Sequence, residues 1–424
     1  MQAPPTSTPS PATRRALGFT LLAAFLGWMF DGLEMGIFPL VANPALKEFA
    51  KNAGVVAEKA YVDHWNGIII ACFLLGAALG GLIFGWLGDR LGRVRAMIMS
   101  MLAYSLFTGV MYFAQSPWQL GLCRFLAAIG MGGEWSLGVA LVMEAWPRDK
   151  RPLMAGLIGA AANFGYAIVA VIGIRFKITQ DSWRWVMLVG AAPAVLTLLI
   201  AKFVPESERW QESVSKTGVV RNPLQEIFAP ELRRTTILAI LFASVALIVT
   251  WGSLQNIPLW IDRDLAHGNA QAKSVGQLWS SIGAIVGCLI APLVAARFGR
   301  RPVYFGLCLC SLITGSILYR CFDAYTNGLL FMIFIAAGFG AAFYGWLPQY
   351  LPELFPTRIR ATGQGLAFNF GRILAAVGVL NLGWFLGRFE GSYAKAGAAM
   401  VFIYLIGMVL IWFAPETRGR PLPE

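Results

Sequence analysis

Long apolar runs alternate with short polar segments along almost the whole chain. Each run is about 20 residues long, which is enough for a helix to cross a hydrocarbon core of roughly 30 Å. The runs are continuous and lack the two-residue alternation of barrel strands, so they predict membrane-spanning α-helices. Twelve spans are predicted, at residues 17–41, 66–88, 96–115, 118–146, 153–174, 184–204, 236–260, 275–296, 302–320, 328–352, 361–386 and 395–414.

The polar segments divide these spans into two sets of six. The long internal segment 205–235 is charged and joins the sixth span to the seventh. We therefore expect one six-helix bundle at 17–204, a linker loop at 205–235 and a second six-helix bundle at 236–414. Residues 1–16 are expected to form a disordered tail, because the first 13 are rich in Pro, Ser and Thr. Residues 415–424 form a short C-terminal tail.

Three motifs occur twice in the same order, about 208 residues apart. GWLGDRLGR at 85–93 returns as PLVAARFGR at 292–300, and EAWPRDKR at 144–151 returns as ELFPTRIR at 353–360. PESER at 205–209 returns as PETR at 415–418. A duplicated half in a very apolar chain is the pattern of a transporter built from two repeats around a central site. Gly-rich stretches within the spans, such as 76–81 and 130–133, predict close helix packing.

Composition supports a membrane protein and gives its orientation. The chain is 57% hydrophobic and 13% charged, whereas soluble domains carry about 25% charged residues. If the N-terminus is inside, the inner segments hold 20 Lys and Arg and the outer loops hold 11. This bias predicts a protein of the cell (inner) membrane with both termini on the cytoplasmic side. It also explains the net charge of +12 without nucleic-acid binding.

Other classes of protein lack support. The cysteines and histidines show no metal or redox spacing, and no phosphate-binding loop of the Gly-x-x-x-x-Gly-Lys type is present. We therefore expect no enzyme activity, metal or cofactor. A membrane sensor would need a signalling domain, for which the short tail and linker leave no room. The expected partners are a small-molecule substrate, protons and the lipid bilayer, with the protein acting as a monomer.

The repeated motifs resemble a known family. GWLGDRLGR at 85–93 is similar to the loop signature of the major facilitator superfamily, and RFLAAIGMG at 124–132 resembles its second signature. PESERW at 205–210 and PETRG at 415–419 resemble the half-end signatures of its sugar porter branch. GGEWS at 132–136 and PELFPTRIRATG at 352–363 resemble its bacterial organic-anion symporters, such as those for sialate, monocarboxylates and aromatic acids. The resemblance implies two pseudo-symmetric six-helix bundles and proton-coupled transport.

Five ionisable residues lie well inside predicted spans: Asp31, Glu34, Arg124, Glu134 and Arg372. On insertion scales, each costs roughly 2.5–3.5 kcal/mol at mid-bilayer, so they must form pairs or face a wet cavity. Asp31 and Glu34 share one helix face. Arg124 is predicted at a depth similar to Asp31, which makes a pair between them sterically possible.

The resemblance gives Asp31 the position of the sugar-porter acid that couples to the proton. A carboxyl's proton affinity depends on burial and on a nearby cation, so separating such a pair can switch it. The alternative is a permanently closed ion pair. Glu134 is a second candidate, either for a proton or for a substrate contact; alternatively, it is a hydrogen-bonded acid that anchors helix packing.

Arg372 has no acid within one helical turn and lies near the predicted midplane. A guanidinium in a wet cavity is a ready partner for a carboxylate. Alternatively, Arg372 pairs with an acid of another helix, Asp31 or Glu34 included. The candidate substrate-binding residues are Arg372, Arg124, Asn163, Gln255, Asn256 and Asn369, although each amide alone is more often a contact between helices. The candidate proton-coupling residues are Asp31, Glu34 and Glu134.

Charged residues also gather at the cytoplasmic ends of the spans. The resemblance implies a salt-bridge network that latches the outward-facing state, while ordinary positive-inside topology is the alternative for the arginines. The second repeat has Ala296 in place of Asp89, so an acid at this position is present in one half only. The candidate gating residues are Asp89, Arg90, Arg93, Glu144, Arg151, Arg297, Arg300, Glu353, Arg358 and Arg360.

The sequence therefore predicts a secondary transporter that moves an organic acid anion by proton symport through alternating access. The alternative is a carrier of sugars or other neutral solutes, in which case Arg372 would be a structural residue.

Overall fold

The computed structural model describes residues 11–176, 179–217, 222–266, 269, 271–380 and 388–424. Helices coincide with every predicted span. The first half contains α1 (Pro11–Asn52), α2 (Glu58–Leu91), α3 (Arg93–Val110), α4 (Pro117–Ala145), α5 (Arg151–Arg175), α6 (Trp183–Gly190) and α7 (Ala194–Phe203). The second half contains α10 (Pro230–Gly252), α11 (Ile257–Trp260), α12 (Ala272–Phe298), α13 (Arg300–Arg320), α14 (Asn327–Tyr350), α15 (Arg360–Leu380), α17 (Tyr393–Met400) and α18 (Tyr404–Leu410).

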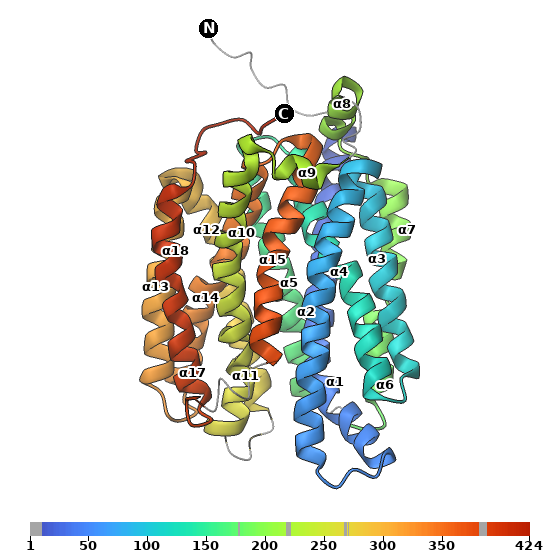
Figure 1. The fold of residues 1–424 in the computed structure, drawn as a ribbon, viewed down its shortest axis with the longest axis vertical. Coiled ribbons are helices and arrows are strands. Elements are labelled where there is room, and N and C mark those ends of the chain that lie inside the picture. The colour runs from blue at the N-terminus through green and yellow to red at the C-terminus, as the bar shows by residue number, and fades with distance from the viewer. Residues whose placement is uncertain (1–10, 177–178, 218–221, 267–268, 270, 381–387) are drawn as a thin grey trace.

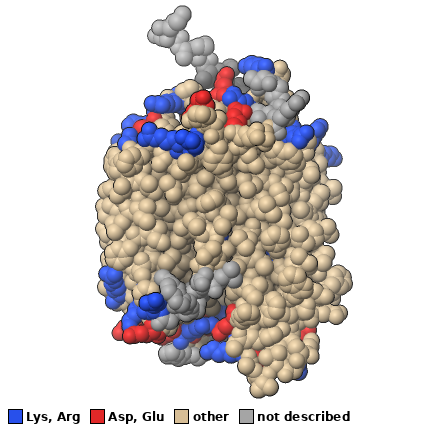
Figure 2. All heavy atoms as spheres, in the orientation of Figure 1, with Lys and Arg blue, Asp and Glu red and all other residues tan. Residues whose placement is uncertain are grey.

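The helices have the length and surface of membrane spans. Within the described residues, 11 helical segments are long and apolar enough to cross a bilayer. Helix α15 covers the described part of the remaining predicted span, of which residues 381–386 lie outside the described residues. Figure 2 shows charged side chains in bands at the two ends, separated by a broad and almost uncharged belt. Phe113 and Leu198 are both 72% exposed, as expected where lipid replaces water.

Two boundaries differ from the prediction. Helix α1 begins at Pro11, so residues 11–16 of the expected disordered tail are helical. Proline is favoured at the first helical position, and Ala and Arg follow it with high helix propensity. The linker 205–235 is not simply a loop, because it holds α8 (Glu208–Thr217), α9 (Pro223–Ile227) and the start of α10.

The seventh predicted span is interrupted. Helix α10 ends at Gly252, and Pro258 follows close behind, so the regular ladder of backbone hydrogen bonds cannot continue. The chain goes on through η2 (Leu254–Asn256), α11 and the π-helical turn η3 (Ile261–Leu265). Such breaks are tolerated inside a membrane protein where the backbone is covered by protein or lines a cavity.

The two halves meet along two helix pairs. Helix α2 packs along α15, and α5 packs along α12; Figure 1 shows α2 and α15 side by side. The predicted close packing within the first half is confirmed. A Cβ atom on Gly80 would lie 1.9 Å from the Ile129 carbonyl oxygen, and one on Gly132 would lie 2.0 Å from the Ala77 carbonyl oxygen.

The C-terminus and helices α8 and α9 lie at one end of the bundle, where α1 also begins (Figure 1). We call this the termini end. Glycines of the repeated motif start one helix of each half there: Gly92 precedes α3 with φ of 107°, and Gly299 precedes α13 with φ of 101°. A side chain at either position is strained.

We expect Gly92→Ala to destabilise the protein by about 2 kcal/mol or more, because alanine rarely adopts this backbone conformation. Its Cβ would also lie 2.3 Å from Glu206 Oε2. The measurement is the midpoint of thermal unfolding, with tryptophan fluorescence as the signal. Gly306→Ala is the control, because a Cβ on Gly306 meets nothing within 4 Å. Equal midpoints for the two variants would contradict the prediction.

Candidate functional site

A cavity of about 80 Å³ lies at the centre of the molecule, between the two halves. Helices α1, α5, α10, α12, α14 and α15 all contribute to its wall. Three of the predicted substrate-binding residues line it: Asn163, Gln255 and Arg372. Gln255 comes from the interrupted seventh span, and its Nε2 donates a hydrogen bond to Tyr166 Oη at 3.1 Å. This contact joins the two halves beside the cavity.

Arg372 is the cationic group of this cavity. Its side chain is buried, and its guanidinium lies over the Phe368 ring at 5.5 Å from the centroid. Within the described residues, Nε has no hydrogen-bond partner and no acid forms an ion pair with Arg372. Asp31 is near enough for an electrostatic interaction. A positive charge in this setting is available to an anionic ligand.

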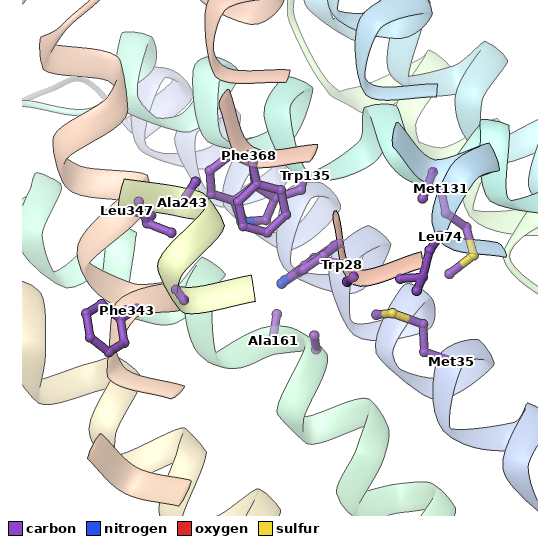
Figure 3. Packing of buried hydrophobic residues seen from close by; sticks show 14 of the residues in the cluster. Trp28, Met35, Leu74, Met131, Trp135, Ala161, Ala243, Phe343, Leu347 and Phe368 are labelled. Carbon is purple, nitrogen blue, oxygen red and sulfur yellow. The ribbon is translucent and has the colours of Figure 1, made fainter. Parts of the chain in front are cut away.

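Aromatic rings form much of the remaining wall. Phe368 stacks on Trp135 with 3.8 Å between the ring centroids. Trp28 and Tyr344 each present an edge toward Phe368, at 6.3 Å and 6.0 Å. Figure 3 shows the Trp135 and Phe368 rings overlapping, with Trp28 beside them. A flat apolar ligand would find stacking surfaces next to the guanidinium.

The arginine of α4 is paired away from the cavity. Arg124 forms a buried ion pair with Glu34, and its guanidinium lies 4.6 Å and 4.5 Å from the ring centroids of Phe38 and Phe73. The predicted pair between Asp31 and Arg124 is therefore wrong. Helix α1 continues 11 residues past the predicted end at 41, and the acid that reaches Arg124 is Glu34, one turn beyond Asp31.

Asp31 and Glu134 form a second buried group in the first half. Both side chains are almost fully buried, and none of their carboxylate oxygens has a hydrogen-bond partner in the described part of the chain. They interact electrostatically with each other. Glu134 packs on Gly27, where an added Cβ would lie 2.1 Å from its Oε1. Two buried carboxylates without hydrogen-bond partners repel each other when both are ionised.

Two predicted amides point elsewhere. Asn369 donates from Nδ2 to the carbonyl oxygens of Gly132 and Gly365, at 3.1 Å and 2.9 Å. It therefore connects α15 to α4. Asn256 donates to the Trp251 carbonyl oxygen at 3.3 Å, within its own interrupted span. Neither amide is part of the wall of the central cavity.

A charged network closes the termini end. In the first half, Arg93 donates to Asp89 Oδ1 at 2.6 Å and to Glu144 Oε1 at 3.1 Å, and all three side chains are buried. In the second half, Arg300 donates to both carboxylate oxygens of Glu353, at 3.0 Å and 2.6 Å. The two copies of the motif therefore build the same arginine–glutamate pair.

The network also crosses between the halves. Asp89 accepts hydrogen bonds from the backbone N–H groups of Ala361 and Thr362 at the start of α15, at 3.1 Å and 2.8 Å. It thus caps a helix of the other half, where a carboxylate is most favourable. Arg360 donates to Glu144 Oε1 at 2.8 Å, again across the halves. These contacts join α2 and α4 to α15.

The other predicted gating residues lie outside this core. Arg90 and Arg297 each lie over an aromatic ring of their own helix, and neither forms an ion pair with a described residue. Arg151 donates to the Trp146 carbonyl oxygen at 3.1 Å. Arg358 pairs with Glu226 of α9 at 2.5 Å.

An ion pair also joins the halves at the opposite end. Arg263 Nη2 of η3 lies 3.2 Å from Asp63 Oδ1 of α2, and both side chains are close to half exposed. Contacts between the halves are therefore present at both ends of the bundle.

Comparison with known proteins identifies the fold. Residues 17–379 match the profile of the Major Facilitator Superfamily. The chain belongs to the Major Facilitator Superfamily. It is a multi-pass membrane transporter of metabolites and not an enzyme. The structure also resembles the proton:xylose symporter XylE of Escherichia coli, with a TM-score of 0.75, 17% identity and coverage of 97% and 98% of the two chains.

Curated relatives of this superfamily member span nearly the whole chain. The probable 4-methylmuconolactone transporter of Cupriavidus pinatubonensis is 28% identical over 94% of this chain and 91% of its own length. The cis,cis-muconate transport protein of Acinetobacter baylyi is 28% identical over 94% and 95%. The sialic acid transporter NanX of Escherichia coli is 25% identical over 85% and 84%.

Several site residues of this superfamily member escaped the sequence prediction. The aromatic residues of the cavity wall were not predicted. Aromatic residues deep inside a span, away from both membrane interfaces, are a signal that could have indicated them. The helix caps were not predicted either. Glu206 accepts from the backbone N–H groups of Arg93 and Val94, and Glu416 accepts from those of Arg300 and Arg301. The repeated Pro-Glu therefore marks a carboxylate that starts the third helix of each half.

We expect the Glu416 cap to make stability depend on pH. Burial alone would raise the pKa of this carboxyl, but backbone hydrogen bonds from Arg300, Arg301 and Arg418 outweigh it and hold the pKa below its usual value. A lowered pKa stabilises the folded protein above the unfolded pKa of about 4.3, and this stabilisation is lost as pH falls through the folded pKa.

The measurement compares thermal midpoints of the parent protein and Glu416→Gln across pH. The parent should be more stable at pH 7, and the difference should shrink below about pH 4, where the parent carboxyl becomes neutral like the amide. Glu424→Gln at the exposed end of the chain is the matched control. A difference that grew as pH fell would contradict the sign of the effect.

Proposed function

We propose that this transporter carries a planar organic acid anion together with protons, by alternating access. The observation that carries the proposal is Arg372, a buried guanidinium in the central cavity without an acidic ion-pair partner among the described residues. A carboxylate supplies the two oxygens that a guanidinium binds best. Asn163 and Gln255 supply further polar groups on the same wall.

The aromatic wall supports a flat substrate over a sugar. Trp28, Tyr344 and Phe368 surround the space next to Arg372 with ring faces and edges. Relatives at 25–28% identity carry names that fit this chemistry, among them transporters of muconate, niacin and 3-(3-hydroxyphenyl)propionate. Aromatic and conjugated acids are therefore preferred here to lactate or sialate.

Proton coupling is assigned to Asp31 and Glu134. Asp31 interacts electrostatically with both Glu134 and Arg372, so its charge is coupled to the second acid and to the anion site. When the substrate anion occupies Arg372, it takes up part of the positive charge that stabilises an ionised Asp31. Proton uptake by the acid pair then becomes more favourable, which couples the two ligands. Glu34 and Arg124 act in this scheme as a structural ion pair.

The termini-end network acts as the gate of this cycle. The protein lies in the inner membrane with both termini on its cytoplasmic side. The support for this orientation is the excess of Lys and Arg in the termini-end segments. Asp89, Arg93, Glu144 and Arg360 close that end, while the exposed pair Asp63–Arg263 closes the other. Substrate reaches Arg372 when the contacts at one of the two ends open.

The test uses purified protein in proteoliposomes that contain a pH-sensitive dye. cis,cis-Muconate, benzoate, nicotinate, sialate, lactate, glucose and xylose are added in turn, and inward proton flux is recorded. Internal acidification with the conjugated or aromatic acids, above the level in protein-free liposomes, is expected. Acidification with sugars alone would overturn the proposal and make this chain a neutral-solute carrier.

A further inference from the structure

The cap that Asp89 provides at the termini end is present in one half only. In the first half, the Asp89 carboxylate caps the start of α15. The equivalent residue of the second half is Ala296, and the equivalent helix start is that of α5. Helix α5 begins without a side-chain cap, and Pro152 in its first turn has no N–H group to offer. The second copy of the contact thus lacks its negative charge.

A large cavity occupies this place. It has a volume of about 1070 Å³ and is lined by both Ala296 and the start of α5. The first half contributes the turn between α4 and α5, and the second half contributes the ends of α12 and α14 and the C-terminal tail. The tail is held in position, because Thr417 donates to Glu353 at 2.5 Å and Arg360 donates to the Pro423 carbonyl oxygen at 2.8 Å.

The wall of this cavity is strongly basic. Five cationic side chains line it without forming an ion pair among the described residues: Arg148, Lys150, Arg151, Arg418 and Arg420. The two acids of the wall are Asp149 and Glu353, and Glu353 is already bound by Arg300 and Thr417. The wall therefore carries a surplus of positive charge, and its like charges repel one another.

A buried amide adds a second, independent observation. The Gln349 side chain is 3% exposed and lines the cavity. Neither its Oε1 nor its Nε2 has a hydrogen-bond partner in the described part of the chain. A buried amide without partners is costly, and such groups are normally satisfied by protein, water or a ligand. Gln349 therefore places an unpartnered amide in the wall of a basic cavity.

We propose that this cavity binds a phosphate-bearing anion. The ligand would supply the negative charge that Ala296 lacks, with arginines around the phosphate oxygens and the Gln349 amide as a further donor. Five cations exceed what a single carboxylate can neutralise, which favours a multivalent phosphate group over the transported acid. The volume suits a phosphate ester or a lipid headgroup. The bound anion contacts both halves, so it stabilises the closed termini end.

The experiment measures binding in two arms, which distinguish the sources of phosphate. In the first arm, sodium pyrophosphate is titrated by calorimetry into protein held in phosphatidylcholine nanodiscs. In the second, vesicles of phosphatidylcholine with dansyl-phosphatidylglycerol report lipid binding by energy transfer from tryptophan. The test variants are Arg148→Ala/Arg420→Ala and Gln349→Leu. The matched control is Arg233→Ala/Arg234→Ala, which removes two exposed arginines from the start of α10 at the same end.

Saturable binding in either arm, weakened about tenfold or more by Arg148→Ala/Arg420→Ala and about threefold by Gln349→Leu, is expected. The control should bind within about twofold of the parent protein. Response in the pyrophosphate arm identifies a soluble phosphate ester, and response only in the vesicle arm identifies a headgroup. Absence of saturable binding in both arms, or equal weakening by the control, would overturn the proposal. Neither result depends on transport.

Discussion

Replacing Arg372 by alanine should reduce substrate uptake about 100-fold or more, the largest effect that we expect from a single substitution. Removing one partner of a buried, hydrogen-bonded charge pair costs about 2–5 kcal/mol, and each 1.4 kcal/mol is a factor of ten. Arg372→Lys keeps the charge but not the planar fork, so it should retain a measurable fraction of the activity. Uptake of labelled substrate into proteoliposomes is the measurement.

Arg320→Ala serves as the control for this variant. It removes an exposed arginine at the end of α13, a helix that contributes no residue to the wall of the cavity. Uptake by this control should match the parent protein. If Arg372→Ala folded and still transported the acid at the parent rate, Arg372 would be a structural residue and the anion site would lie elsewhere.

Replacing Asp31 by asparagine should uncouple transport from protons. The amide keeps the size of the side chain but cannot gain or lose a proton in the working pH range. Proton influx driven by substrate should fall about tenfold or more, because proton relays inside membranes are built from ionisable groups of this kind. Accumulation of substrate against its gradient should disappear. Exchange of labelled for unlabelled substrate needs no net proton movement and should persist.

The comparison variants are Glu134→Gln and Asp323→Asn. Glu134→Gln changes the second member of the acid pair and should also reduce coupling, whereas Asp323→Asn makes the same chemical change on an exposed residue and should not. Uphill accumulation by Asp31→Asn with its proton flux intact would remove Asp31 from the coupling mechanism. If Asp31→Asn lost both exchange and accumulation, the substitution would instead have damaged the cavity.

The arrangement of spans was predictable, because each apolar run carries its own signal. A bilayer leaves helices as the only continuous solution for such runs, and the repeated motifs give the division into halves. The boundaries were less predictable. Helix α1 extends from Pro11 to Asn52 because its polar ends continue as helix outside the apolar run. Asp31 and Glu34 share one helix face, so spacing alone did not show that Glu34 is the acid that pairs with Arg124.

Pairings between distant helices could not be derived from spacing alone. Glu206 and the start of α3 are 113 residues apart, and Asp89 and Thr362 are 273 residues apart. Arg372 and Gln255 were recognisable as polar groups in apolar runs, and the cavity contains both. Asn256 and Asn369 had the same signal, but their amides satisfy nearby backbone carbonyls. Composition does not distinguish a helix contact from a ligand contact.

The single Asp89 cap has a consequence for the path of the substrate. At the termini end, the seam between α2 and α15 is fastened by a buried carboxylate, whereas the seam between α5 and α12 has Ala296 at the matching position. If the termini-end network is the gate that we propose, the second seam should separate first when this end opens, with the fastened seam as the pivot. The released molecule should therefore leave beside α5, along a route that a perfectly symmetric duplicate would have divided equally between two exits.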